Sequence, residues 1–166
     1  HVGFNVAADP AYTVSYMGVN GGLVIIVADD PGLYSSQNEQ DTRMVARAAQ
    51  LPVLEPSDSS EAKEFMKMAF DLSEKFDRPF VFRTTTRLAH SQGIVELHER
   101  EEIPDKPYER NIAKNVMMPG NARDVMWKLK RETMNLRKKQ IDCQLTEWRW
   151  EIPKSALLPA GFLTSM

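Results

Sequence analysis

The stretch that decides the fold is GGLVIIVADD, which spans residues 21–30. Its central residues, Leu23 to Ala28, are all apolar, and most of them are β-branched. A pair of glycines precedes this run and a pair of aspartates follows it. A short apolar run between such boundaries is typical of a strand that is buried on both faces, so we expect it in the middle of a parallel sheet.

Strand-like and helix-like segments alternate after this stretch. LPVLEP, residues 51–56, and FVFR, residues 80–83, predict two further strands. Between them, Asp58 and Glu61 have the spacing of a capping box, which predicts a helix over residues 59–76. Its buried face is expected to hold Ala62, Phe65, Met66, Ala69, Phe70, Ser73 and Phe76. The alternation predicts an α/β fold in three layers, an open parallel sheet with helices on both faces.

The second half of the chain has a different character. Residues 98–120 are charged, contain prolines and lack an apolar period, which favours a linker or surface excursion after a domain formed by residues 1–97. Asn121 is expected to cap a helix over residues 121–140, whose apolar face should pack on another part of the protein. Residues 141–166 predict the start of a following domain.

The composition argues against several classes of protein. The chain has 166 residues and a formal net charge of −2, which supplies no general attraction to nucleic acid or to an anionic membrane. Its apolar runs are far shorter than the roughly 20 residues of a membrane-spanning helix. Cys143 is the only cysteine, whereas an iron–sulfur cluster takes about four. We therefore expect a cytoplasmic protein with neither nucleic acid nor membrane as a partner.

Polar residues follow the predicted strands, where parallel sheets bind their ligands. The candidates for a site at this edge of the sheet are Ser35, Ser36, Gln37, Asn38, Thr85 and Arg87. The segment RTTTR, residues 83–87, combines hydroxyl and guanidinium groups that could clamp a carboxylate or a partner, although threonine is also an ordinary strand residue. Asp29 and Asp30 could hold magnesium, but a role in turning the chain is favoured, and no metal ligand is assigned.

The pattern of residues identifies no catalytic group. We find no serine at a strand-to-helix elbow and no glycine-rich phosphate loop, and His90 and His98 are expected at the surface. A receiver-like signalling module is an alternative of the same architecture, but it needs an aspartate where the second strand is followed by Glu55. A nucleic-acid contact by the basic residues of 123–139 is a weaker alternative than a solvated or interdomain face.

Several segments together resemble a known family. HVGFNVAADP, GVNGGLVIIVADDPG, SSQNEQDTR, PVLEPSDSSEAKEF and RPFVFRTTTRLAHSQGIVEL occur in this order between residues 1 and 97. They resemble the domain that binds the thiamine diphosphate pyrimidine in the alpha subunits of indolepyruvate ferredoxin oxidoreductases, within the 2-oxoacid:ferredoxin oxidoreductase group. Residues 142–160 depart from the family's pattern.

The resemblance implies a function for the parent enzyme. The family oxidatively decarboxylates an aryl-2-oxoacid such as indolepyruvate to an acyl-CoA, with ferredoxin as electron acceptor. It implies thiamine diphosphate, magnesium and 4Fe-4S clusters as cofactors, and a beta subunit and ferredoxin as partners in an oligomeric enzyme. By resemblance, His1, Gly3 and Asn5 belong to a loop that faces the thiazolium and substrate, while the family's activating glutamate lies upstream of His1. The isolated chain is expected to be inactive and to bind none of these cofactors tightly.

Overall fold

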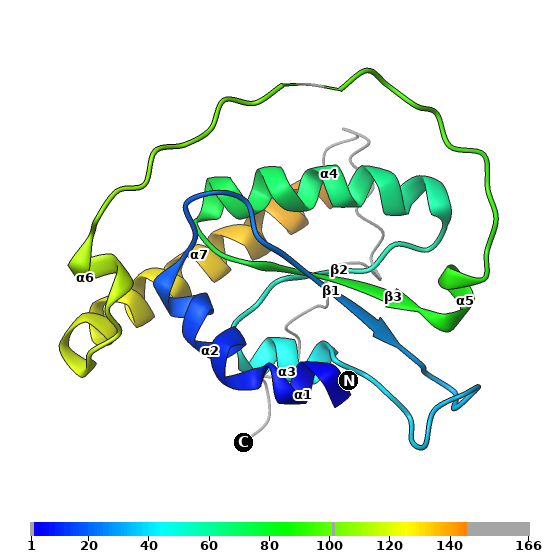
Figure 1. The fold of residues 1–166 in the computed structure, drawn as a ribbon, viewed down its shortest axis with the longest axis horizontal. Helices are drawn as coiled ribbons and strands as arrows, with labels where there is room; N and C mark the ends of the chain where they lie inside the picture. Colours follow the sequence, from blue (N-terminus) through cyan, green and yellow to red (C-terminus); the bar gives the residue numbers. More distant parts are fainter. Residues whose placement is uncertain (1, 101, 146–166) are drawn as a thin grey trace.

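The protein is an α/β structure built on a three-stranded parallel sheet (Figure 1). The computed structural model describes residues 2–100 and 102–145, with the side chains up to residue 136. The strands are β1 (Val24–Asp29), β2 (Val53–Leu54) and β3 (Phe80–Thr85), in the spatial order β1-β3-β2. Both pairs of neighbours are parallel, so the predicted fold class is confirmed.

The position of β1 corrects one prediction. We expected it in the middle of the sheet, yet β3 is the central strand, and β1 lies at an edge of the sheet that the described residues form. Ile26 is 65% exposed, whereas Val27 and Asp29 are buried. An apolar run shows that a strand is suited to burial, but the strand order depends on long-range pairing that the run does not encode.

Helix α4 (Ser59–Phe76) covers one face of the sheet and has the predicted bounds. The Asp58 side chain accepts the backbone N–H of Glu61 at 2.8 Å, so the predicted N-cap is confirmed. The core on this face consists of Leu54, Phe65, Ala69, Phe80 and Phe82. Phe70 was expected to be buried but is 46% exposed, because it lies at the margin of the face rather than over the sheet.

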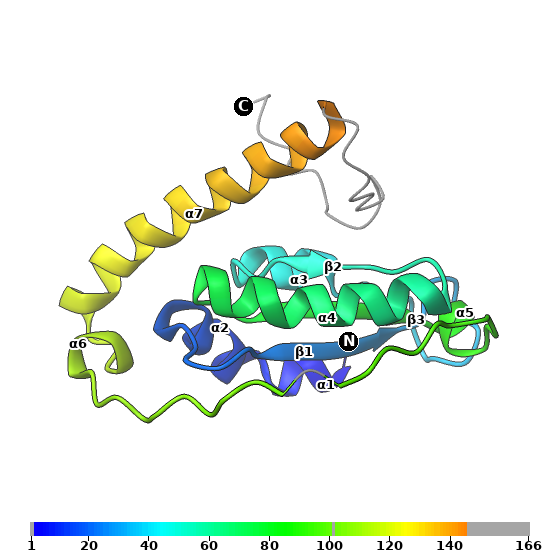
Figure 2. The same ribbon diagram turned by 90° about the horizontal axis from the view of Figure 1, so that it is seen from above.

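Three short helices cover the opposite face. These are α1 (Val2–Val6), α2 (Ala8–Met17) and α3 (Arg43–Ala48). Phe4, Ala11 and Ala46 of these helices pack with Val27, Val53 and Val81 of the strands, and Ala49 and Leu51, which follow α3, complete this core. The predicted three-layer arrangement is therefore present, with α4 on one side of the sheet and α1, α2 and α3 on the other in Figure 1. Seen from above in Figure 2, α4 lies over the strands.

The chain continues from β3 into α5 (Thr86–Ala89), crosses an irregular stretch, and reaches α6 (Ile112–Asn115) and α7 (Pro119–Leu145). The long helix begins before Asn121, whose side chain donates to the carbonyl of Val116 instead of capping the helix. Because α7 extends to Leu145, the predicted start of a following domain is helical over its first residues, and the rest of it lies outside the described residues. The domain boundaries themselves stay a prediction.

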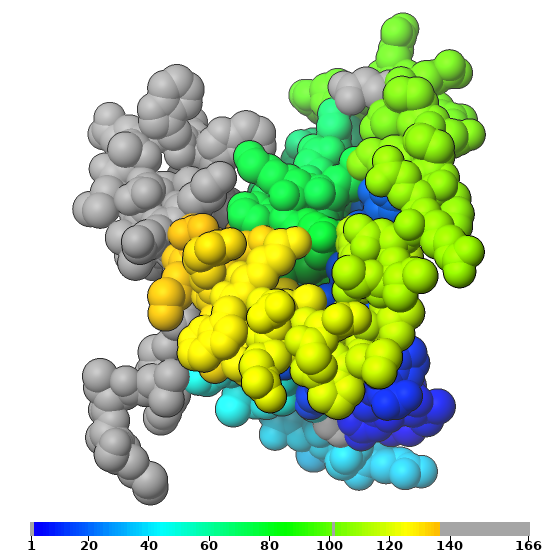
Figure 3. Space-filling model, turned by 90° about the vertical axis from the view of Figure 1, so that its left-hand side faces the viewer, coloured from blue at the N-terminus to red at the C-terminus, as the bar shows by residue number. Residues whose placement is uncertain are grey.

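A corner after α4 ties the C-terminal helices to the sheet. The Asp77 carboxylate accepts the backbone N–H of Val19 at 2.9 Å and pairs with Lys114 of α6 at 2.6 Å and Lys128 of α7 at 3.2 Å. The buried Arg78 donates to the Thr133 hydroxyl at 3.2 Å. Figure 1 shows α6 and the start of α7 at the end of the molecule where the strands begin, and Figure 3 shows their residues exposed on that side. They are therefore remote from the opposite edge of the sheet, where the candidate site lies.

No helix among residues 2–100 and 102–145 is long and apolar enough to cross a membrane.

Candidate functional site

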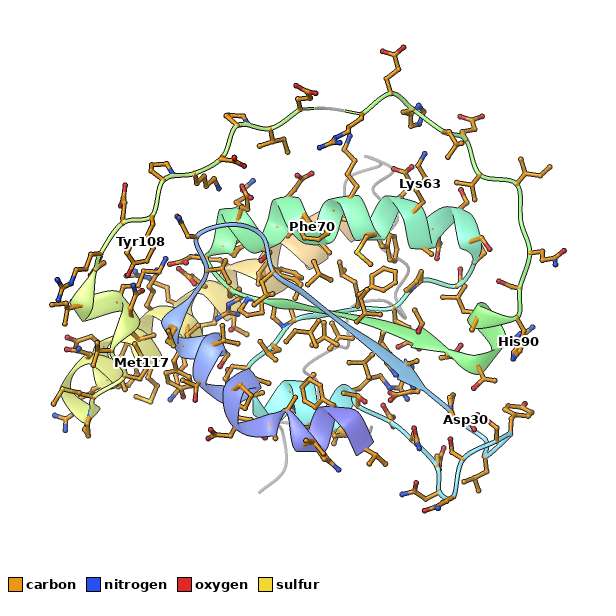
Figure 4. All side chains as sticks on the ribbon, in the orientation of Figure 1. Asp30, Lys63, Phe70, His90, Tyr108 and Met117 are labelled. Carbon is orange, nitrogen blue, oxygen red and sulfur yellow. The ribbon has the colours of Figure 1, made fainter. Side chains whose placement is uncertain are left out.

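The polar residues that follow the strands meet at one edge of the sheet. In Figure 4, Asp30 after β1 and His90 after α5 are both at the end toward which the strands run. The parallel register places Ala28 beside Thr84 and Asp29 beside Thr85, so the segments after these strands begin at the same level. The predicted convergence at the carboxyl edge is therefore confirmed for these two segments.

Asp30 organises the loop that follows β1. Its carboxylate accepts the backbone N–H groups of Ser35 at 2.7 Å, Ser36 at 2.9 Å and Tyr34 at 3.2 Å. It also accepts the hydroxyl of Thr86, from the start of α5, at 2.9 Å. These donors, the Ser35 N–H foremost, lower the pKa of Asp30 to about 2, because they favour the charged form. One carboxylate thus fixes the loop and joins it to α5.

Asp29 takes part in a buried ion pair. The Nε of Arg83 lies 2.7 Å from Oδ2 of Asp29, and both side chains are almost completely buried. Thr42 donates its backbone N–H and its hydroxyl to the same carboxylate, each at 2.6 Å. Burial raises the pKa of Asp29, but the hydrogen bonds from Thr42 and Arg83 outweigh it, so that the pKa is lowered.

Arg83 corrects the hypothesis that RTTTR supplies two guanidinium groups to a clamp. Arg83 is 1% exposed, and its guanidinium pairs with Glu55 after β2 as well as with Asp29. Arg83 of β3 therefore links the carboxyl ends of β1 and β2 through its two ion pairs. Arg87 is exposed, and it makes no ion pair among the residues that the structure describes. Of the two arginines in RTTTR, Arg87 is therefore the one that could bind a ligand.

The arrangement does not suit a magnesium ion. Both aspartates after β1 accept hydrogen bonds from protein donors, as the turn interpretation requires. Within residues 2–100 and 102–145, no group of three or more histidine, cysteine, aspartate or glutamate side chains could hold a metal ion. We derive no metal chemistry from these residues.

An open pocket lies between the loop after β1 and α5. Its volume is about 610 Å³, within the range of small-molecule sites. It is lined by Tyr34, Ser35, Thr86, Arg87 and His90. The pocket offers hydroxyl groups, one guanidinium group, an imidazole and an aromatic ring, a set that suits an anionic ligand with an aromatic part.

The predicted sheet-edge residues have separate places around this pocket. Ser35 and Arg87 line it, and Ser36 gives its backbone N–H to Asp30. Thr85 caps α5 by accepting the N–H of Leu88 at 3.4 Å. Gln37 and Asn38 are exposed in the loop and do not line the pocket.

The sequence did not single out Tyr34, and His90 was assigned to the surface. His90 is indeed exposed, but it lies one helical turn after Thr86, so both side chains reach the same pocket. A short helix predicted directly after β3 would have placed His90 at the pocket. We did not predict this helix because the three consecutive threonines there are typical of a strand. Tyr34 follows Gly32 and Leu33, whose φ angles are both positive, at 91° and 62°. No periodicity in the sequence predicts this turn.

The residues implied to face the cofactor are at the N-terminus. Gly3 and Asn5 lie in α1, so the implied loop is wrong: these residues are helical. Both are exposed, and a Cβ atom at Gly3 would meet nothing within 4 Å. His1 lies outside the described residues. The role of these three residues toward a cofactor stays a prediction.

Comparison with curated proteins identifies relatives of the chain. It is 50% identical over 128 residues to the indolepyruvate oxidoreductase subunit IorA of Archaeoglobus fulgidus, an alignment that covers 74% of the chain and 20% of the relative. The subunit IorA of Pyrococcus abyssi is 61% identical over 99 residues, which cover 60% of the chain and 15% of the relative. That of Methanothermobacter thermautotrophicus is 44% identical over 146 residues, which cover 87% and 24%.

The chain belongs to the IorA family. The resemblance stated from its sequence is therefore confirmed, over the segments that these alignments cover. The chain spans about a fifth of the length of the IorA relatives. No family model and no solved structure matches it.

Proposed function

We propose that this chain is a segment of an indolepyruvate:ferredoxin oxidoreductase and forms one wall of its substrate site. The observation that carries the proposal is the identity of 44% to 61% with relatives that are all named indolepyruvate oxidoreductase subunit IorA. The reaction is the oxidative decarboxylation of an aryl-2-oxoacid such as indolepyruvate to an acyl-CoA, with ferredoxin as electron acceptor. A beta subunit and ferredoxin are the proposed partners.

The pocket beside α5 supplies a physical role for the chain. An aryl-2-oxoacid carries a carboxylate and an aromatic ring. The exposed guanidinium of Arg87 can form charge-assisted hydrogen bonds with the carboxylate, and the Ser35 and Thr86 hydroxyls lie in the same pocket. Tyr34 offers an aromatic surface to the ring of the substrate. The chain's contribution in this proposal is to bind and orient the substrate.

The cofactors belong to the parent enzyme in this proposal. Thiamine diphosphate would supply the electron sink for loss of carbon dioxide, with magnesium at its diphosphate and 4Fe-4S clusters for electron transfer. The described residues contain no set of ligands for magnesium or a cluster, so we assign those sites to other parts of the polypeptide or to its partners. We also propose a cytoplasmic location.

The test is to replace Arg87 in the complete enzyme that contains this segment. Arg87→Ala is expected to raise the KM for indolepyruvate by about 10-fold or more, since a charge-assisted hydrogen bond contributes roughly 1.5–3 kcal/mol. Arg87→Lys should recover part of the affinity. Arg47→Ala is the matched control, because Arg47 is also exposed but lies in α3, away from the pocket. Equal KM values for the alanine variants at both positions would contradict the assignment of the pocket.

A further inference from the structure

The pocket beside α5 contains few hydrogen-bond donors that are free to bind a ligand. The hydroxyl of Thr86 donates to Asp30 at 2.9 Å, and the hydroxyl of Ser35 donates to the same carboxylate at 3.4 Å. A hydroxyl has one hydrogen, so neither group can donate to a ligand oxygen while it donates to Asp30. The remaining donors in the lining are Tyr34, Arg87 and His90. Binding of acceptor oxygens in this pocket therefore depends on these three side chains.

Arg87 and His90 lie on one helical turn. The backbone N–H of His90 donates to the carbonyl of Thr86 at 3.2 Å, and the backbone of His90 is helical, with φ −97° and ψ −2°. Residues three apart on a helix are neighbours, with roughly 5–6 Å between their Cβ atoms. Both side chains are exposed in the pocket, and neither forms a hydrogen bond within residues 2–100 and 102–145. Two available donors are therefore neighbours on the α5 side of the pocket.

The two donors suit different acceptors. The guanidinium of Arg87 is a permanent cation whose geometry matches a carboxylate. The imidazole of His90 has at least one N–H in both of its protonation states, so it can always donate to a single oxygen. A 2-oxoacid carries two such acceptors on neighbouring carbon atoms, a carboxylate and an oxo oxygen. Neighbouring donors on one helix therefore match the head group of a 2-oxoacid.

We propose that His90 donates a hydrogen bond to the 2-oxo oxygen of the substrate and so distinguishes 2-oxoacids from carboxylic acids that lack this oxygen. The inference rests on the proposed function, because it takes the pocket as the site of an aryl-2-oxoacid. His90 keeps its proton, and no bond forms or breaks at its ring. The hydrogen bond positions the oxo group and polarises it, and it strengthens when negative charge develops on that oxygen.

Tyr34 is the alternative donor to the oxo oxygen. It belongs to the loop after β1, on the side of the pocket opposite to α5, and it is 78% exposed. When Arg87 binds the carboxylate, the adjacent oxo oxygen lies on the α5 side as well. His90 is on that side, so it is the donor to which we commit.

Kinetics of the complete enzyme with two ligands test the role of His90. Indolepropionate has the ring and the carboxylate of indolepyruvate but lacks the 2-oxo oxygen. His90→Leu is expected to lower kcat/KM for indolepyruvate by about 5-fold or more, because one hydrogen bond is lost. It should leave the inhibition constant of indolepropionate unchanged. His90→Gln keeps an N–H donor and should recover part of the loss. His98→Leu is the matched control, because His98 is exposed outside the pocket and should change neither value.

Arg87→Ala separates this inference from the proposed function. It is expected to weaken both ligands, since both carry the carboxylate. If it affected neither ligand, the proposed function would be contradicted, and the role of His90 with it. If Arg87→Ala weakened both ligands while His90→Leu changed them by the same factor, or changed neither, only the role of His90 would be overturned. A loss confined to indolepyruvate in Tyr34→Phe but not in His90→Leu would overturn it in favour of the tyrosine hydroxyl.

Discussion

At the scale of single residues, two neighbouring aspartates have different structural roles. Asp29 is held in a buried pair with Arg83, and Asp30 holds the loop that forms one side of the pocket. The sequence predicted that both lie at the end of a strand. It could not predict which arginine reaches Asp29, because that contact depends on the pairing of β1 with β3, more than fifty residues later in the chain.

The buried pair leads to a prediction on stability. Arg83→Met should destabilise the protein by about 3–5 kcal/mol, because it leaves the Asp29 carboxylate buried without its counterion. Arg87→Met is the matched control at the same end of the sheet, and its cost should stay within about 0.5 kcal/mol because Arg87 is exposed. Urea denaturation measures both variants. Similar midpoints would show that Arg83 is not the counterion of a buried carboxylate.

The pKa of Asp30 gives a prediction on acid sensitivity. Its pKa is lowered from 3.8 to about 2, so its hydrogen bonds stabilise the folded loop above pH 4 and are lost as the pH falls through about 2. The side-chain carboxyl carbon of Asp30, followed by NMR, should therefore titrate near pH 2, and the amides of Ser35 and Ser36 should shift with it. A midpoint near 4 would mean that the loop does not hold this carboxylate.

At the scale of elements, α4 is the part of the fold that the sequence predicted best. Its cap, its length and most of its buried face are encoded locally, by Asp58 and by apolar residues at helical spacing. The start of α7 was predicted less well, because the helix begins at Pro119, before Asn121, which was expected to cap it. The order of the strands could not be predicted, because local patterns do not specify which strands become neighbours.

The packing of α4 can be tested by truncating one side chain. Phe65 is 4% exposed in the core between α4 and the sheet, so Phe65→Ala should cost about 3–5 kcal/mol. Asp71 is exposed on the same helix, and Asp71→Ala should cost less than about 0.5 kcal/mol. Chemical denaturation with a two-state fit provides the comparison. If the two variants unfolded at the same denaturant concentration, the buried face of α4 would be assigned wrongly.

At the scale of the whole molecule, the chain presents an open pocket at one end, and at the other end the helices α6 and α7, which form ion pairs with Asp77. The pocket is open, and the strand β1 is unpaired on one side within the described residues. The sequence predicted the polar edge and the family, but not the pocket, because the pocket depends on the left-handed turn at Leu33 and on α5.

The most direct test of this account is the turnover of indolepyruvate. The complete subunit with its partner, supplied with thiamine diphosphate, magnesium, coenzyme A and indolepyruvate, is expected to reduce ferredoxin or a dye. The 166-residue chain is expected to give no turnover above a boiled control and no micromolar binding of thiamine diphosphate by calorimetry, because the described residues contain no site for the diphosphate-bound metal. Turnover by the isolated chain, or a complete enzyme that fails to oxidise indolepyruvate, would contradict the account.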